Sequence, residues 1–365
     1  MGFRIIVITP KWESTDRSFV DNGVKVHTIY KGPILRGTIH WYISKLPIFG
    51  KLFALVIREI EWSVAVFLKL KKIIKKESVD IIETTETGNL FLSYFNKPII
   101  LRAHADFYAR QLLSGERVWL GARLAWSLQK YFMKMSKFLI TPSDFQMKWM
   151  IKELRYYSSN KMVIPNYIHP MLTKRRENKI LDDDTISLLY TGRIEKIKGI
   201  IELLDALEII ISNNSSITLT IAGSFSHSIT EKEFLDQVTK RKLNNNINYL
   251  GYVDINELAD VYINSTLFIM PSYFETFCIS IAEAMYFGLP VIATNVGGVP
   301  SVLDHNKNGI LIEKGDSDLL AKSIIDLLKQ PGKMEMFSKE GKNKAMSTFT
   351  LQSVVEKSIN IYNLL

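Results

Sequence analysis

The sequence predicts an α/β protein made of two doubly wound domains, each with a largely parallel β-sheet between layers of helices. Short apolar segments alternate repeatedly with longer segments of helical periodicity, which is typical of parallel α/β layers. The chain has 365 residues, more than one hydrophobic core ordinarily serves. The periodicity also breaks at residues 166–184. We therefore expect one domain at residues 1–165 and a second at residues 166–348.

The expected strands are the short apolar segments themselves, taken in chain order. In the first domain they are residues 3–9, 24–29, 80–83, 98–102, 138–141 and 161–165, the last leading into the linker. In the second domain they are residues 186–190, 218–222, 247–249, 267–270 and 291–293. Helices are expected between them, and a helix at about residues 349–365 is expected to pack back on the first domain.

Composition narrows the class of protein. The hydrophobic fraction of 47% indicates a globular chain, and the single cysteine, Cys278, excludes an internal disulfide framework. Arg4 is followed by only a short β-branched run without a small-residue cleavage site, so no signal peptide is expected. These features together predict a protein of the reducing cytoplasm.

Charge is distributed unevenly along the chain. Residues 1–165 hold 26 basic and 13 acidic side chains, whereas residues 166–365 hold 20 and 24. A basic first domain suggests an anionic partner, either a membrane surface or a nucleic acid. No nucleic-acid-binding motif accompanies the charge, so we expect no nucleic-acid partner.

Residues 46–76 favour the membrane surface. Charged residues such as Lys51, Arg58 and Glu59 interrupt the apolar run, so it cannot span a bilayer. Aromatic and aliphatic residues are followed by a basic cluster, consisting of Lys69, Lys71, Lys72, Lys75 and Lys76. This pattern predicts amphipathic helices that rest on the inner, anionic face of the cell membrane. An ordinary core helix with a solvated basic end fits the same residues.

Two carboxylates, Glu275 and Glu283, lie eight positions apart around a strand-to-helix junction. Glu275 falls in the loop after the strand at 267–270, and Glu283 falls inside the helix expected at 279–287. A carboxylate can accept hydrogen bonds from both hydroxyls of a vicinal diol, so the pair suits a hexose and a ribose. The helix N-terminus between them suits a phosphate. The spacing therefore predicts a sugar-nucleotide site, although an isolated pair would more often be two solvated side chains.

Two cations, Arg193 and Lys198, follow the strand at 186–190 on a loop that opens a helix. Cations beside a helix N-terminus form a site for the two phosphates of a nucleoside diphosphate. No metal site or cofactor is expected, because the six histidines are scattered. Asp182–Asp184 precede their strand, and Asp316 is better explained as a helix N-cap.

The segment PSYFETFCISIAEAMYFGLPVIATNVGG at residues 271–298, with GRIEKIKG at 192–199, resembles the retaining GT-B glycosyltransferases of the glycosyl transferases group 1 family. This glycogen-synthase-like resemblance implies two Rossmann-like domains facing a central cleft. It also implies metal-independent transfer of a hexose-type sugar from a nucleotide diphosphate donor, UDP or GDP, to a cell-surface glycan or lipid-linked acceptor.

The resemblance also implies roles for single residues. It places Glu275 on the donor hexose and Glu283 on the ribose, while Arg193 and Lys198 stabilise the departing diphosphate. It places His104, just after the strand at 98–102, near the hexose and its reacting carbon. The catalytic set is thus Arg193, Lys198, Glu275 and His104. The further donor-binding positions that it implies are Gly192, Gly223, Tyr252, Val253, Thr276, Phe277, Cys278 and Ile279.

The chain departs from this family at its start. Residues 3–11 resemble the second strand of the family, so a first strand and a glycine-rich loop are expected to be missing. A noncatalytic sugar-nucleotide-binding subunit, or a truncated inactive product that supports a partner transferase, would tolerate this loss. An epimerase of the same fold also stays open, whereas a phosphorylase is disfavoured because no lysine context for pyridoxal phosphate is recognisable.

Overall fold

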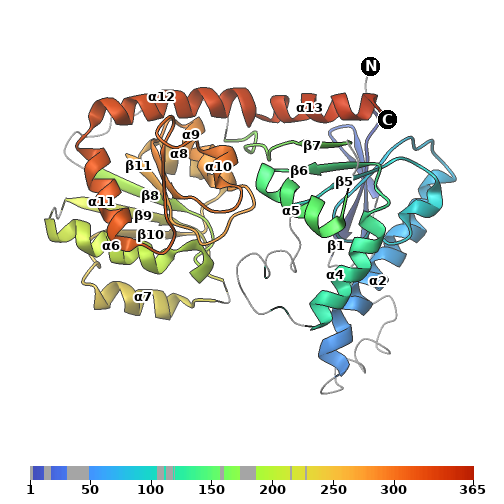
Figure 1. Ribbon diagram of the computed structural model, residues 1–365, viewed down its shortest axis with the longest axis horizontal. Coiled ribbons are helices and arrows are strands. Elements are labelled where there is room, and N and C mark those ends of the chain that lie inside the picture. Colours follow the sequence, from blue (N-terminus) through green and yellow to red (C-terminus); the bar gives the residue numbers. More distant parts are fainter. Residues whose placement is uncertain are drawn as a thin grey trace. The chain divides into compact units, whose positions relative to one another are not determined.

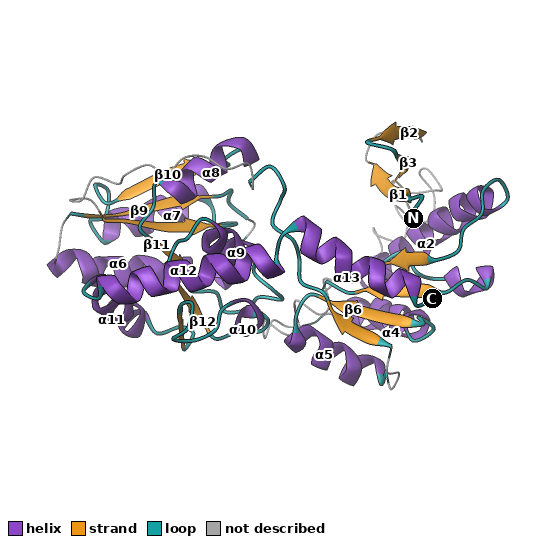
Figure 2. Cartoon of the chain, turned by 90° about the horizontal axis from the view of Figure 1, so that it is seen from above, coloured by secondary structure: helices purple, strands orange, loops and turns teal. Residues whose placement is uncertain are grey.

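The structure is a computed structural model with two compact units. It describes residues 3–11, 18–30, 49–104, 111, 118, 120–156, 160–172, 186–213, 216–226 and 228–365. Unit 1 comprises residues 1–141, 147–162 and 365, and unit 2 comprises residues 142–146 and 163–364. Strands and helices alternate in both units, which confirms the predicted α/β class (Figures 1 and 2). The packing of the C-terminal helix on the first domain stays a prediction, and most of the expected linker lies outside the described residues.

Unit 1 contains two small sheets. In one, β1 (Ile6–Lys11) pairs parallel with β3 (Val24–Tyr30), and β2 (Ser18–Asp21) pairs antiparallel with β3. The other has the order β4 (Ile82–Thr84), β5 (Ile99–Arg102), β6 (Phe138–Thr141) and β7 (Lys161–Val163). The predicted strands are confirmed within a few residues. Strand β2 was not predicted, because its four residues are all exposed and show no alternation of apolar and polar side chains.

The helices of unit 1 are α2 (Phe49–Ile74), the 3₁₀-helix η1 (Leu92–Phe95), α4 (Leu120–Met133) and most of α5 (Asp144–Leu154). Helix α2 packs against α4, and its residues Leu70 and Ile73 are buried. Within the predicted amphipathic region, the described residues form one helix of 26 residues, α2, and not several helices. None of the helices within the described ranges is long and apolar enough to cross a membrane.

Unit 2 contains one parallel sheet of six strands in the order β10-β9-β8-β11-β12-β13. The strands are β8 (Ile186–Thr191), β9 (Ile217–Ala222), β10 (Ile247–Gly251), β11 (Leu267–Met270), β12 (Val291–Thr294) and β13 (Ile310–Ile312). From β8 the chain builds the sheet outward through β9 and β10, and then returns to place β11 on the other side of β8. Ligands of doubly wound sheets bind at the carboxyl ends of the strands at this switch point.

Helices cover both faces of this sheet (Figure 1). They are the 3₁₀-helix η2 (Lys196–Lys198), α6 (Ile200–Asn213), α7 (Glu231–Lys240), α8 (Ile255–Ile263), α9 (Ile279–Tyr286), α10 (Val299–Val302), α11 (Ser317–Leu328), α12 (Pro331–Thr348) and α13 (Leu351–Asn363). As predicted, Asp316 caps α11, since its carboxylate accepts a hydrogen bond of 2.8 Å from Leu319 N.

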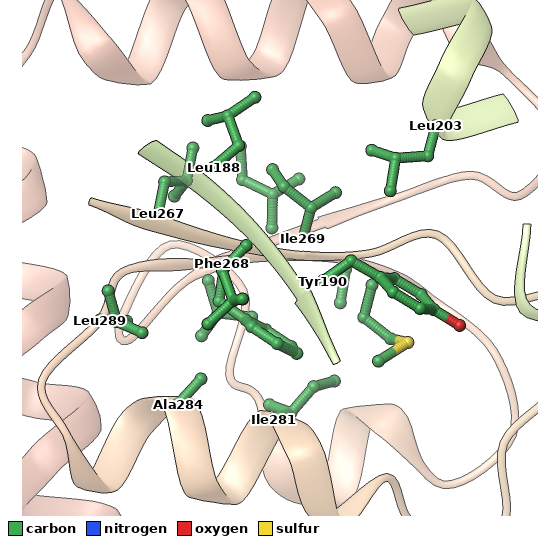
Figure 3. Packing of buried hydrophobic residues seen from close by; sticks show 14 of the residues in the cluster. Leu188, Tyr190, Leu203, Leu267, Phe268, Ile269, Ile281, Ala284 and Leu289 are labelled. Atoms are coloured by element: carbon green, nitrogen blue, oxygen red, sulfur yellow. The ribbon is translucent and has the colours of Figure 1, made fainter. Parts of the chain in front are cut away.

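The core of unit 2 fixes the two central strands. Figure 3 shows Tyr190 of β8 and Phe268 of β11 among buried side chains, with Leu203 of α6 on one face and Ile281 of α9 on the other. Because both faces are covered, these strands are apolar along nearly their whole length. The ends of β8 and β11 are therefore held side by side, and each is followed by one of the two predicted site loops.

Candidate active site

Two loops meet at the switch point of the unit 2 sheet. The segment between β8 and α6 carries Arg193 in its loop and Lys198 at the end of the 3₁₀-helix η2, and the loop after β11 carries Glu275. A backbone hydrogen bond of 2.8 Å from Tyr273 N to Ile197 O joins them directly. Residues that lie about eighty positions apart in sequence are thus neighbours in space, because the parallel strands that precede them are neighbours in the sheet.

Lys198 and Glu275 form a nearly buried ion pair in this place. Lys198 Nζ lies 2.7 Å from Glu275 Oε1, and their side chains are 18% and 9% exposed. Ser272 Oγ donates a second hydrogen bond of 2.9 Å to the same oxygen. Burial is the largest single influence and lowers the pKa of Lys198, but Glu275, Cys278 and Glu195 together outweigh it and the net pKa is raised. Lys198 therefore carries its positive charge at neutral pH.

Arg193 supplies the second cation, in a more open position. Its guanidinium Nη2 lies 3.1 Å from Glu195 Oε1, and its side chain is 57% exposed, whereas that of Glu195 is 4% exposed. The buried Tyr190 hydroxyl donates a hydrogen bond of 2.7 Å to Arg193 O. The Tyr190 hydroxyl thus fixes the backbone of the loop, while the guanidinium of Arg193 remains accessible to an anion.

Glu283 lies in the second turn of α9 and is also buried. Its Oε2 accepts a hydrogen bond of 2.7 Å from the Tyr262 hydroxyl. Burial raises the pKa of Glu283, and the Tyr262 hydrogen bond opposes that rise. Burial also raises the pKa of the Cys278 thiol, and the charges of Glu275 and, more weakly, Glu283 add to the effect.

Residues Thr276 to Ile279 form the entry into α9. Cys278 precedes the helix in the left-handed region, with φ 76° and ψ 84°, a strained conformation for a residue with a side chain. Thr276 O accepts a hydrogen bond of 2.7 Å from Ser143 Oγ. The Phe277 side chain is buried in the core and packs edge-on against Phe349. Any contact that Phe277 makes with a ligand would therefore come from its backbone.

The predicted glycines lie along the same edge of the sheet. Gly192 N bonds Ala222 O at 3.0 Å, and Gly223 N bonds Gly251 O at 2.7 Å, which places the ends of β8, β9 and β10 in a row. A Cβ on Gly223 would lie 1.8 Å from Gly192 O, so only glycine fits there. Tyr252, next in the chain, is 77% exposed, and Val253 is partly buried.

His104 is exposed and belongs to unit 1, whereas the other predicted catalytic residues belong to unit 2. Partial desolvation and then the positive charge of Arg102 lower the pKa of His104, while Glu83 opposes them. Arg102 itself pairs with Glu83 at 2.7 Å. The role of His104 at the reacting carbon stays a prediction.

Sequence reasoning missed the polar partners of the predicted residues. Ser272 holds Glu275, Glu195 holds Arg193, and Tyr262 holds Glu283. Ser272 and Glu195 lie within three residues of their partners, so proximity in the sequence is a signal that could have predicted both contacts. Tyr262 could not, because a tyrosine on the buried side of a helix has the same pattern as any core residue. In the part of the chain that the structure describes, no group of three or more His, Cys, Asp or Glu could hold a metal ion.

Comparison with known proteins identifies the family. A model of Glycosyltransferase Family 4 matches residues 1–171, and one of Glycosyl transferases group 1 matches residues 172–344. The capsular polysaccharide biosynthesis glycosyltransferase CapM of Staphylococcus aureus is 29% identical over 192 residues, which are 52% of this chain and 49% of CapM. The chain thus spans about half the length of the curated relatives it matches.

Solved structures share the fold at low identity. Sucrose-phosphate synthase from Thermosynechococcus elongatus has a TM-score of 0.78 and 18% identity, over all of this chain and 89% of that one. HepE from Anabaena, solved in complex with UDP and glucose, has a TM-score of 0.70 and 19% identity, over 94% of this chain and 87% of that one. The two family models and the shared fold confirm the predicted family and the GT-B fold, and the chain belongs to the GT-B glycosyltransferases that carry a glycosyl transferases group 1 domain.

Proposed function

We propose that this protein transfers a hexose-type sugar from a nucleotide diphosphate donor, UDP or GDP, to a cell-surface glycan or its lipid-linked precursor. The observation that carries the proposal is the buried pair of Lys198 and Glu275 beside Arg193, at the switch point of the unit 2 sheet. The relative CapM is named for capsular polysaccharide biosynthesis, and the structural neighbour HepE binds UDP and glucose. Both support a sugar nucleotide and a glycan.

The residues of unit 2 divide the work of such a reaction. Negative charge grows on the diphosphate as its bond to the sugar carbon breaks, and Arg193, Lys198 and the N-terminus of α9 would stabilise that charge without a metal. Glu275 would hold hydroxyls of the hexose, and Glu283 those of the ribose. Lys198 must then exchange part of its contact with Glu275 for a contact with phosphate.

We further propose that the configuration at the sugar carbon is retained by attack from the face of the leaving group. The acceptor oxygen forms the new bond to that carbon on the side where the diphosphate departs. The departing phosphate oxygen takes the proton of the acceptor hydroxyl, so charge and atoms balance. A double displacement would need a protein nucleophile, and the sequence gives no evident candidate.

Nucleotide binding is the first test. We expect one of UDP, GDP and ADP, at about 100 times its dissociation constant, to stabilise the protein by roughly 2.7 kcal/mol. This corresponds to a rise in the thermal midpoint of roughly 5–10 °C for the unit that binds. Glu283→Ala should abolish most of the rise, because the ribose loses its carboxylate. Differential scanning fluorimetry measures both.

Glu335→Ala is the matched control, because Glu335 is exposed on α12. It should keep the full rise in midpoint. No stabilisation of the wild type by any of the three nucleotides would contradict the proposed donor site. Stabilisation without transfer from any sugar nucleotide would instead support the noncatalytic binding subunit.

We also propose that the protein rests on the inner face of the cell membrane through helix α2. The exposed basic side chains Lys71, Lys72, Lys75 and Lys76 lie at or just after the carboxyl end of this helix, and Leu68 is half exposed nearby. Cations near an anionic surface each contribute on the order of 1 kcal/mol, and the apolar side chain can enter the interface.

Sedimentation with vesicles tests the membrane proposal. At low salt, the protein should co-sediment with vesicles that contain phosphatidylglycerol and remain in the supernatant with phosphatidylcholine alone. The triple variant Lys72→Glu, Lys75→Glu and Lys76→Glu should lose at least tenfold in apparent affinity. The control reverses three exposed lysines of unit 2, Lys232, Lys307 and Lys339. Equal losses in the two triple variants would point to net charge alone and would contradict a surface on α2.

A further inference from the structure

A buried tyrosine that the reaction scheme does not use holds one of the two site carboxylates. Tyr262 lies on α8 and its side chain is fully buried. Its hydroxyl lies 2.7 Å from Glu283 Oε2 and 2.8 Å from Thr191 Oγ1. Thr191 is the last residue of β8, so the three side chains link that strand, α8 and α9.

The direction of these hydrogen bonds follows from the chemistry of the groups. An ionised carboxylate can only accept, so the single phenolic proton of Tyr262 is donated to Glu283. The phenolic oxygen is then left to accept the proton of the Thr191 hydroxyl. Burial raises the pKa of Tyr262 well above its ordinary value, and the charge of Glu283 adds to the rise. Tyr262 therefore keeps its proton and remains a donor across the physiological range.

Packing fixes the tyrosine ring as well as its hydroxyl. The ring stacks on Phe287, with centroids 5.3 Å apart and planes at 11°, and lies 6.1 Å from the ring of Phe268. Phe287 is the C-cap of α9 and follows Glu283 by four residues, so the two lie on one face of the helix. The ring and the hydroxyl therefore contact the same helix face one turn apart, which leaves the hydroxyl little freedom to move.

We propose that Tyr262 is a positioning residue for the donor nucleotide: by holding Oε2 of Glu283, it presents Oε1 of that carboxylate to the hydroxyls of the ribose. This rests on the proposed function, in which Glu283 contacts the ribose. A carboxylate held at one oxygen has lost the rotation that would otherwise oppose binding of a diol at the other. Thr191 supports the arrangement from the strand end by fixing the phenolic oxygen.

A role in packing alone predicts a different result from a role in ribose recognition. A tyrosine that only fills the core would affect every ligand of the site equally when it is changed. A tyrosine that aims a carboxylate at the ribose would affect only ligands that carry the ribose hydroxyls. Nucleotides with and without these hydroxyls therefore separate the two roles.

The test is isothermal titration of the full chain with UDP, GDP and ADP and with their 2′,3′-dideoxy counterparts. Tyr262→Phe keeps the ring and removes only the hydroxyl. We expect it to weaken the ribonucleotide that binds by about 10- to 100-fold, because a hydrogen bond to a charged group is lost. Binding of the matching dideoxynucleotide should change less than about twofold. In turnover, KM for the donor should rise while kcat stays within about threefold.

Tyr156→Phe is the matched control, since Tyr156 is a buried tyrosine of unit 1 whose hydroxyl lies 3.4 Å from Ser136 O. It should leave both affinities unchanged. If Tyr262→Phe does not fold, Thr191→Val tests the inference in its place. It should reduce the preference for the ribonucleotide over its dideoxy counterpart by about threefold.

The outcomes separate this inference from the proposed function. A wild type that binds none of the three ribonucleotides overturns both. A wild type that binds one of them but does not prefer it over its dideoxy counterpart overturns the inference alone. Equal losses for both ligands in Tyr262→Phe, or an unchanged preference in either Tyr262→Phe or Thr191→Val, also overturn it.

Discussion

Lys198→Ala should lower kcat by about 10²- to 10³-fold while it weakens nucleoside diphosphate binding by no more than about tenfold. Removal of one donor from a developing negative charge in a water-excluded site has an effect of this size in other enzymes. The Lys198 side chain is only 18% exposed, and its raised pKa keeps it charged, so its field would act on the proposed diphosphate with little screening by water. Steady-state kinetics and isothermal titration measure the two effects separately.

The same substitution also has a structural effect that must be separated from the kinetic one. It leaves Glu275 buried without its lysine, and loss of one partner of a buried pair costs about 3–5 kcal/mol. Activity should therefore be measured well below the thermal midpoint of the variant. The matched control is Lys196→Ala, because Lys196 is an exposed lysine only two residues before Lys198. This variant should keep the wild-type kcat.

A different pattern would argue against a role in the transition state. If Lys198→Ala lowers kcat/KM and the affinity for the diphosphate by the same factor, the lysine binds substrate and transition state equally. Lys198→Arg helps to distinguish charge from geometry. It should recover part of kcat if charge alone matters, and little if the compact ammonium is needed beside Glu275.

The positions of the site loops could be predicted from the sequence because they depend on local signals. Apolar segments marked β8 and β11, and the residues after each parallel strand must lie at one edge of the sheet. That rule predicts Lys198 and Glu275 at the same edge, where Lys198 Nζ lies 2.7 Å from Glu275 Oε1. Because a carboxylate accepts hydrogen bonds from a diol and a cation attracts a diphosphate, the sequence also predicts that Glu275 binds sugar hydroxyls and that Lys198 binds phosphate.

The supporting partners could not be predicted, because each depends on a contact between distant segments. Tyr262 reaches Glu283 across 21 positions, and its hydroxyl is invisible in a pattern that distinguishes only apolar from polar faces. Strand β13 was missed for a related reason. It has only three residues, two of them partly exposed, so its own sequence shows no clear strand pattern. Its strand conformation depends on pairing with β12, a contact that a local pattern does not reveal.

Gly199→Ala should destabilise unit 2 by about 2–5 kcal/mol, because two costs add at one position. Gly199 has φ +69°, and a residue with a side chain pays about 1–2 kcal/mol in that region. The added Cβ would also lie 2.0 Å from Pro271 O, and overpacking of a close contact typically costs about 1–3 kcal/mol. The thermal midpoint of the unit should fall by roughly 4–20 °C.

The position of Gly199 makes this loss functional as well as structural. Gly199 directly follows Lys198, and Pro271 begins the loop that carries Glu275, so the clash would push the two site loops apart. The hydrogen bond from Tyr273 N to Ile197 O lies within the same contact and would lengthen with it. We therefore expect Gly199→Ala to lose nucleotide stabilisation even at temperatures where unit 2 remains folded.

Substitutions at two other glycines of unit 2 separate the cost of the backbone conformation from the cost of the steric clash. Gly251 has φ +67°, but the nearest atom to its added Cβ is 3.8 Å away, so Gly251→Ala should show only the conformational cost. Gly332 lies near the start of α12 with no atom within 4 Å, and Gly332→Ala should be neutral or slightly stabilising. The opposing outcome is that Gly199→Ala lowers the midpoint no further than Gly251→Ala does. In that case the close approach of the two loops is not what requires glycine at residue 199. The ion pair of Lys198 and Glu275 must then be what holds the two loops together.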